Sequence, residues 1–181
     1  MLTAIVGSGP AGCALSCFLA ERGYECIVFD DDKRPELLVG ESLVPAAVPY
    51  LQRLGIEDAV ADISVRKYGA ALRHAAGPRV NFIFSRLHRS VPDYAYNVPR
   101  PGFDHIIRNR AKQLGVRFVP QRARLEKCDT PDRDIQLSSD SFRAAGLLKH
   151  PDFLVDATGR HRLFSRLLSI PADKGQRDNI S

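Results

Sequence analysis

A glycine-rich turn near the N-terminus has the residue types and spacing of a phosphate-binding loop. It lies between an apolar run, Leu2–Val6, and a helical pattern that begins at Ala11. A dinucleotide diphosphate needs backbone N–H groups at a helix N-terminus, where the helix dipole favours negative charge. Such a loop needs one glycine for the tight turn, a second for phosphate approach and a third for close helix–strand packing. The turn therefore predicts a dinucleotide site made by Gly7, Gly9, Pro10, Ala11 and Gly12.

Acidic residues follow the second predicted strand, where the ribose of a bound dinucleotide would lie. Asp30 stands 18 residues after Gly12 (30 minus 12) and can accept a hydrogen bond from a ribose hydroxyl. Asp31 is a second candidate for contact with the adenosine, although three successive aspartates also suit a solvated turn. The glycine turn and the acid leave the choice between NAD and FAD open.

The elements that position these residues predict an α/β fold with a parallel sheet. Leu2–Val6, a helix over 11–22 and a strand over 24–29 form a βαβ unit of about thirty residues. An amphipathic helix with Phe103 and Ile107 on its apolar side precedes a strand over 116–119. A last buried strand is expected over 153–157.

The middle of the chain predicts shorter elements of a different character. Ser42 is the expected N-cap of a helix that runs through 46–53, and another short helix is expected over 56–63. Strands over 68–75 and 79–84 are expected to pair as a hairpin, and a short strand follows over 94–98. The polar stretch 123–149 predicts a β-meander with a turn at 130–132.

Three segments in a fixed order resemble the superfamily of FAD-dependent monooxygenases and halogenases. They are Gly40-Glu41-Ser42-Leu43-Val44-Pro45, Tyr96-Asn97-Val98-Pro99-Arg100 and Asp156-Ala157-Thr158-Gly159-Arg160. The resemblance implies a Rossmann-type FAD-binding domain with a parallel sheet, plus an inserted β-sheet of a substrate domain that begins near Tyr68. The division expected is 1–67 for the FAD-binding βαβ unit and flavin-side loop, 68–100 for the insert, and 101–181 for the return to the FAD domain.

The same resemblance assigns cofactor roles to several residues. The glycine turn would hold the FAD diphosphate, and Asp30 the adenosine ribose. Arg100 would lie close to the flavin and its phosphates, and the segment with Asp156 and Gly159 would lie beside the diphosphate. The loop with Glu41 and Ser42 would run along the flavin, although the same two residues also suit a helix start.

Within the superfamily, the segment from Gly40 to Gly55 resembles the flavin-dependent halogenases that act on phenols and pyrroles. Lys67 matches the position of the functional lysine in that family. The resemblance implies that Lys67 holds or reacts with hypohalous acid made at the flavin, and delivers electrophilic halogen to an aromatic ring. An ammonium can donate a hydrogen bond to the acid, and an amine with a lowered pKa can form a chloramine. A solvated lysine at the start of a strand is the alternative reading.

Other functions remain open at this stage. The alternatives are an aromatic hydroxylase, a reductase of the geranylgeranyl type and a non-catalytic nucleotide-binding module. A halogenase would need a small aromatic substrate, a halide and reduced flavin from a separate reductase. Family members are about twice this length or more, so we expect a missing C-terminal half or a partner chain to complete the site.

Composition limits the remaining classes. The net charge of +5 comes from basic residues spread along the chain, without a basic helix or an RNA-binding motif, so we expect no nucleic acid. No apolar run suits a membrane span, and no basic leader precedes Leu2, which predicts a cytoplasmic protein. The four cysteines and five histidines lack metal-ligand spacing, so no metal is expected, and the cysteines suit small packing residues.

Overall fold

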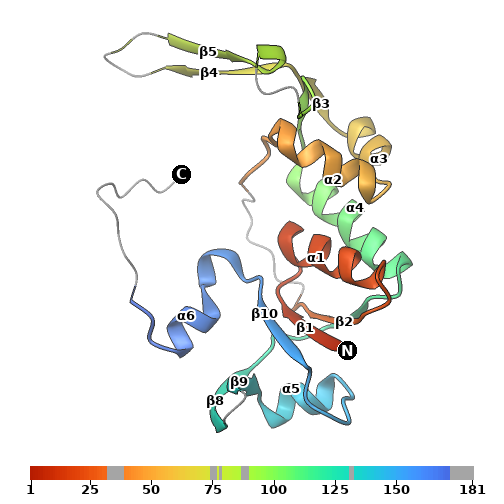
Figure 1. Cartoon of the computed structure of the whole chain (residues 1–181), viewed down its shortest axis with the longest axis vertical. Coiled ribbons are helices and arrows are strands. Elements are labelled where there is room, and N and C mark those ends of the chain that lie inside the picture. The colour runs from red at the N-terminus through yellow and green to blue at the C-terminus, as the bar shows by residue number, and fades with distance from the viewer. Residues whose placement is uncertain (32–38, 74–76, 78, 87–89, 131–132, 172–181) are drawn as a thin grey trace.

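A four-stranded parallel sheet is the centre of the molecule (Figure 1). The computed structural model describes residues 1–31, 39–73, 77, 79–86, 90–130 and 133–171. The strand order is β10-β1-β2-β7, and every neighbouring pair is parallel. The strands are β1 (Leu2–Val6), β2 (Glu25–Phe29), β7 (Arg117–Val119) and β10 (Phe153–Asp156).

Apolar side chains cover both faces of this sheet, as a parallel sheet requires. All five residues of β1 are buried. Ile5 packs in one core with two helices, while Ala4 and Val6 pack in a second core with Leu137. The first core is covered by α1 (Pro10–Ala20) and α4 (Arg100–Gln113), and the second by the segments around β9 (Arg133–Leu137) and α5 (Ser139–Ala144).

Short elements continue the first core beyond the sheet. A 3-10 turn, η1 (Pro45–Ala47), leads into α2 (Val48–Arg53), and α3 (Glu57–Asp62) follows. Val48, Leu51 and Val60 bury their side chains in the core that α1 and α4 also share. α2 and α3 therefore attach residues 48–62 to the core of the domain.

Two antiparallel pairs lie beyond the helices, toward the upper end of Figure 1. β3 (Val65–Lys67) pairs with β6 (Ala95–Asn97), and β4 (Gly69–Arg73) pairs with β5 (Arg79–Ile83). Ser42 forms an isolated antiparallel bridge with Asn97 on the other edge of β6. The remaining elements are η2 (Phe84–Arg86), β8 (Leu125–Thr130), η3 (Gly159–His161) and α6 (Leu163–Leu167).

The expected α/β fold is confirmed, with three local corrections. Ser42 does not cap a helix, because the extended residue before η1 is Val44 and Ser42 pairs with β6 instead. The expected β-meander stops after the β8–β9 hairpin, since Ser138 caps α5 by accepting a hydrogen bond from the N–H of Ser141. β3 was not predicted as a strand. Residues 131 and 132 of the turn expected at 130–132 lie outside the described residues, and so do residues 74–76 and 78 between the two strands of the expected hairpin.

Within the described part of the chain, no helix has both the length and the apolar character that crossing a membrane requires.

Candidate cofactor-binding site

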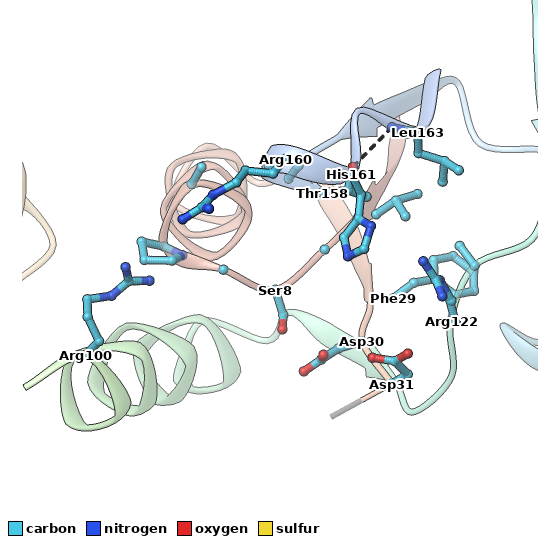
Figure 2. A pocket seen from close by; sticks show the side chains of 18 of the residues that line it. Ser8, Phe29, Asp30, Asp31, Arg100, Arg122, Thr158, Arg160, His161 and Leu163 are labelled. Atoms are coloured by element: carbon cyan, nitrogen blue, oxygen red, sulfur yellow. Dashed lines mark hydrogen bonds between the residues drawn. The ribbon is translucent and has the colours of Figure 1, made fainter. Parts of the chain in front are cut away.

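A cavity of about 740 Å³ opens at the carboxyl ends of β1, β2 and β10 (Figure 2). This edge of an open parallel sheet is where nucleotide cofactors bind, because loops and a helix N-terminus meet there. The lining comes from segments far apart in sequence: the glycine turn, the end of β2, the loop after β10, and single residues such as Arg100 and Arg122.

The glycine turn packs so closely on the end of β10 that side chains are excluded. Gly7 has φ +109°, and a Cβ there would lie 2.5 Å from the carbonyl oxygen of Ala157. A Cβ on Gly12 would collide with the carbonyl oxygen of Gly7 and lie 3.1 Å from the Cβ of Ala157. These positions therefore need glycine for the turn and for the packing of α1 on the sheet.

Gly9 differs from both neighbours, because a Cβ there would meet nothing within 4 Å. It is the N-cap of α1 and lines the cavity together with Pro10 and Ala11. The first turn of the 11-residue helix thus borders the cavity, and Pro10 at the first helical position lacks a donor. The arrangement suits an anionic group at this end of the helix.

Asp30 and Asp31 line the cavity where β2 ends. Asp30 is buried, and its carboxylate accepts a hydrogen bond from the guanidinium of Arg108 on α4. The Arg108 guanidinium also lies over the ring of Phe118, 4.9 Å from its centroid. This ion pair orients the Asp30 carboxylate at the wall of the cavity where a ribose is expected.

Arg100 lies at the start of α4, on the opposite side of the cavity from Arg122 in Figure 2. Its Nε donates to Asp104 Oδ1 at 3.1 Å, and Nη1 donates to the carbonyl oxygen of Val39. A Cβ on Gly40 would lie 2.9 Å from Nη1, so the guanidinium packs directly on the loop before Ser42. Arg100 therefore connects the cavity with that loop.

Asp156 holds the loop after β10 and is absent from the cavity lining. Its carboxylate accepts from the backbone N–H groups of Thr158 at 3.0 Å and of Phe164 at 2.8 Å. Burial raises the pKa of Asp156, but hydrogen bonds from Thr158, Phe164 and Leu163 outweigh burial and leave that pKa below its usual value. Gly159, three residues on, does line the cavity.

The three remaining predicted residues form a second group, outside the cavity lining. Glu41 accepts a hydrogen bond from the backbone N–H of Gly40 at 3.1 Å. The Lys67 Nζ donates to Ser42 Oγ, across the short sheet that β3, β6 and the segment around Ser42 form. Burial lowers the pKa of the half-buried Lys67 amine, because it disfavours the charged form.

Several cavity residues were missed from the sequence. Arg108 is the partner of Asp30, and Arg122, Arg160 and His161 line the cavity. A signal did exist for Arg108: Arg100, Asp104 and Arg108 recur at intervals of four, which places them along one face of a helix. No comparable pattern marks Arg122 or His161.

Comparison with protein families identifies the cofactor of the chain. The family described as FAD binding domain matches residues 1–176. The chain belongs to this family. FAD is accordingly its cofactor, and the open helix N-terminus at Gly9, the basic cavity residues and the acid at the end of β2 fit a flavin adenine dinucleotide.

Several similar proteins are flavin-dependent halogenases. The chain is 30% identical to the flavin-dependent halogenase armH1 of Armillaria mellea, over 89% of this chain and 31% of that protein. It is 30% identical to 1H-pyrrole-2-carbonyl-(peptidyl-carrier protein) chlorinase of Pseudomonas fluorescens, over 92% of this chain and 41% of that protein. The solved structure of the flavin-dependent halogenase CmlS superimposes with a TM-score of 0.72 at 27% identity, covering 93% of this chain and 31% of CmlS. This FAD-binding chain therefore spans less than half the length of these proteins.

Proposed function

We propose that this chain is the FAD-binding part of a flavin-dependent halogenase, in which Lys67 transfers electrophilic halogen to an aromatic substrate. The observation that carries the proposal is the half-buried Lys67 amine, which donates to Ser42 on a loop that Arg100 joins to the FAD cavity. The halogenase relatives support the reaction class, and the pyrrole chlorinase among them supports a phenol- or pyrrole-like ring as substrate.

The cavity residues support FAD binding at this place. The N-terminus of α1, from Gly9 to Ala11, would take the diphosphate, and Asp30 would accept from the adenosine ribose. Arg100 would lie nearest to the flavin end, because it contacts the loop that carries Ser42. Bound FAD supplies the redox chemistry that turns halide and oxygen into hypohalous acid, with electrons from a separate flavin reductase.

Lys67 would act on the hypohalous acid through its terminal nitrogen. As an amine, Lys67 Nζ forms an N–Cl bond while the Cl–O bond of hypochlorous acid breaks, and the departing oxygen leaves as water with the amine proton. The aromatic carbon then takes the chlorine and loses its own proton, which restores the amine. The burial that lowers the pKa of Lys67 increases the share of the nucleophilic amine. Ser42 Oγ orients Nζ during both steps.

The alternative reaction is direct hydroxylation of the aromatic ring, which uses the same cofactor and has no role for Lys67. Halide therefore separates the two reactions. A halogenase gives a halogenated product only with chloride or bromide present, whereas a hydroxylase gives product without either.

The test begins with an FAD titration of the purified chain, followed by flavin absorbance. Product formation is then measured by mass spectrometry on the chain combined with the C-terminal half or partner chain that completes the site. The reaction contains a flavin reductase, halide and simple phenols and pyrroles. We expect halogenated product from the wild type and from Lys127→Ala, an exposed lysine on β8, but none from Lys67→Ala. Equal activity of Lys67→Ala and wild type, or product without halide, would overturn the proposal.

A further inference from the structure

A polar cluster lies behind the strand that carries Lys67. Its centre is Glu57 on α3, whose Oε1 accepts from the hydroxyls of Tyr94 at 2.7 Å and Tyr96 at 2.9 Å. Arg66 Nη2 donates to the Tyr96 hydroxyl at 3.2 Å, and its guanidinium lies 4.5 Å from the centroid of the Tyr94 ring. The two tyrosine rings meet edge to face, with centroids 5.8 Å apart.

The strand register separates this cluster from Lys67. Arg66 pairs with Tyr96, Lys67 pairs with Ala95, and Asn97 bridges Ser42. Because side chains alternate between the faces of a sheet, Arg66 and Tyr96 lie on one face. Lys67 and Ser42 lie on the other. Any movement of β3 that releases Arg66 therefore also moves Lys67 relative to Ser42.

Apolar packing contributes little to the position of β3. Val65 is 69% exposed, Arg66 is exposed and Lys67 is half-buried. Backbone pairing with β6 holds one edge of the strand. On the face toward α3, the strand is held by the polar contacts of Arg66 with Tyr94 and Tyr96. The cluster itself is well anchored, because Tyr96 is buried in the first core.

The ionisation of the cluster keeps it intact around neutral pH. Burial raises the pKa of Glu57, but hydrogen bonds from Tyr94, Tyr96 and Gln52 and the charge of Arg66 outweigh it, so the net pKa lies below the usual value. The hydrogen bond to Glu57 raises the pKa of Tyr94 to about 12. Glu57 is therefore an acceptor and Tyr94 a neutral donor over a wide pH range.

We propose that Glu57, Arg66, Tyr94 and Tyr96 form a positioning cluster that fixes β3 on α3 and thereby holds Lys67 against Ser42. The catalytic role of Lys67 at this position rests on the proposed halogenase function. The positioning itself is independent of that function. The groups facing Lys67 are Ser42 from the flavin-side loop and Ala95 and Asn97 from β6, while Arg66 on its own strand points to the opposite face.

The test is the pH profile of lysine acetylation, measured on the full chain by competitive labelling with acetic anhydride and mass spectrometry. The midpoint of each profile reports the pKa of that lysine, whatever its accessibility. Lys112, Lys127 and Lys149 in the same sample are internal references. The variants are Glu57→Ala, which removes the shared acceptor, and Tyr94→Phe, which removes one donor and keeps the ring. Asp58→Ala is the matched control, because Asp58 is an exposed acid in the same first turn of α3.

In the wild type and in Asp58→Ala, we expect the Lys67 midpoint to lie below those of the reference lysines. In Glu57→Ala it should shift upward to the reference range while the reference midpoints stay unchanged, and Tyr94→Phe should shift it in the same direction by less. If Glu57→Ala unfolds, all midpoints converge and Tyr94→Phe decides. An unchanged Lys67 midpoint in folded Glu57→Ala or in Tyr94→Phe would overturn the positioning cluster. Failure of halogenation in the enzyme assay would overturn only the proposed function, because labelling needs no turnover.

Discussion

Gly9 and Gly12, three positions apart, should respond differently to the same substitution by alanine. Gly9→Ala adds a methyl group where nothing lies within 4 Å, at the cavity edge of the α1 N-terminus. Gly12→Ala adds a methyl group that collides with the Gly7 carbonyl and crowds Ala157. Both variants exchange glycine for alanine, so the effect on the unfolded chain is the same in each. The difference between them isolates the folded-state contacts.

The surroundings of each glycine set the expected changes in stability and in the Kd for FAD. Overpacking at Gly12 should destabilise the fold by about 1–3 kcal/mol, which lowers the melting temperature by about 2–4 °C per kcal/mol in a chain of this length. Gly9→Ala should leave stability within about 0.5 kcal/mol of wild type. It should nevertheless displace the FAD diphosphate from the helix N-terminus, and losing one hydrogen bond to a charged group costs about 1.5–3 kcal/mol. The Kd for FAD should therefore rise roughly ten- to a hundredfold.

The assay pairs thermal unfolding by circular dichroism with FAD titration by fluorescence quenching. The reasoning would be refuted if Gly9→Ala bound FAD as tightly as wild type, or if it lowered the melting temperature as much as Gly12→Ala. A Gly12→Ala protein with wild-type stability would refute the packing argument for that position.

Three further predictions concern single interactions. Arg108→Ala should cost about 3 kcal/mol in denaturant unfolding, because it leaves the Asp30 carboxylate buried without this partner; an Asp30→Ala, Arg108→Ala double variant should lose less than the sum of the singles. The pKa of Asp156 is lower in the folded state, so its contribution to stability is present above the unfolded pKa and is lost as pH falls through the folded value. Urea unfolding between about pH 6 and pH 2 should therefore show a weaker acid dependence for Asp156→Asn than for wild type. Ser138→Ala removes the cap of α5 and should cost about 1 kcal/mol in thermal unfolding, whereas Ser139→Ala, one residue on, should cost less.

Local sequence patterns predicted the helices and strands whose apolar periodicity and turn residues lie within the element itself or directly beside it. β1, α1 and β2 follow one another within thirty residues, and their apolar periods and glycine turn agree with the structure. The hairpin of β4 and β5 is equally local. By contrast, Val65–Lys67 is three residues long and mostly polar, and its partner strand begins at Ala95. Only tertiary pairing makes such a segment a strand, so no local period could reveal it.

In the candidate site too, residues with a local sequence signal were predicted, whereas contacts between distant residues were not. The glycine turn gives its own signal, because backbone geometry demands those residues. The partner of Asp30 is 78 residues away on α4, and the partner of Lys67 is 25 residues away in a loop. Ser42 was misread as a helix cap because a serine before an apolar run looks the same in either role. Pairings of this kind are decided by which elements the sheet brings together, and the spacing of residue types does not record them.

The glycine turn packs on Ala157, so the cofactor site can form only after this late part of the chain has been synthesised. Leu2 donates its N–H to the Asp152 carboxylate, and β1 takes β10 as its parallel neighbour. The first strand therefore pairs with residues that are synthesised about 150 positions later. Strand pairing over such a sequence separation forms slowly compared with a hairpin. A nascent chain that has produced only the βαβ unit presents an open edge of β1 and half a cavity. We therefore expect FAD binding to require both of these distant stretches of chain, and an excised N-terminal βαβ peptide should not retain it.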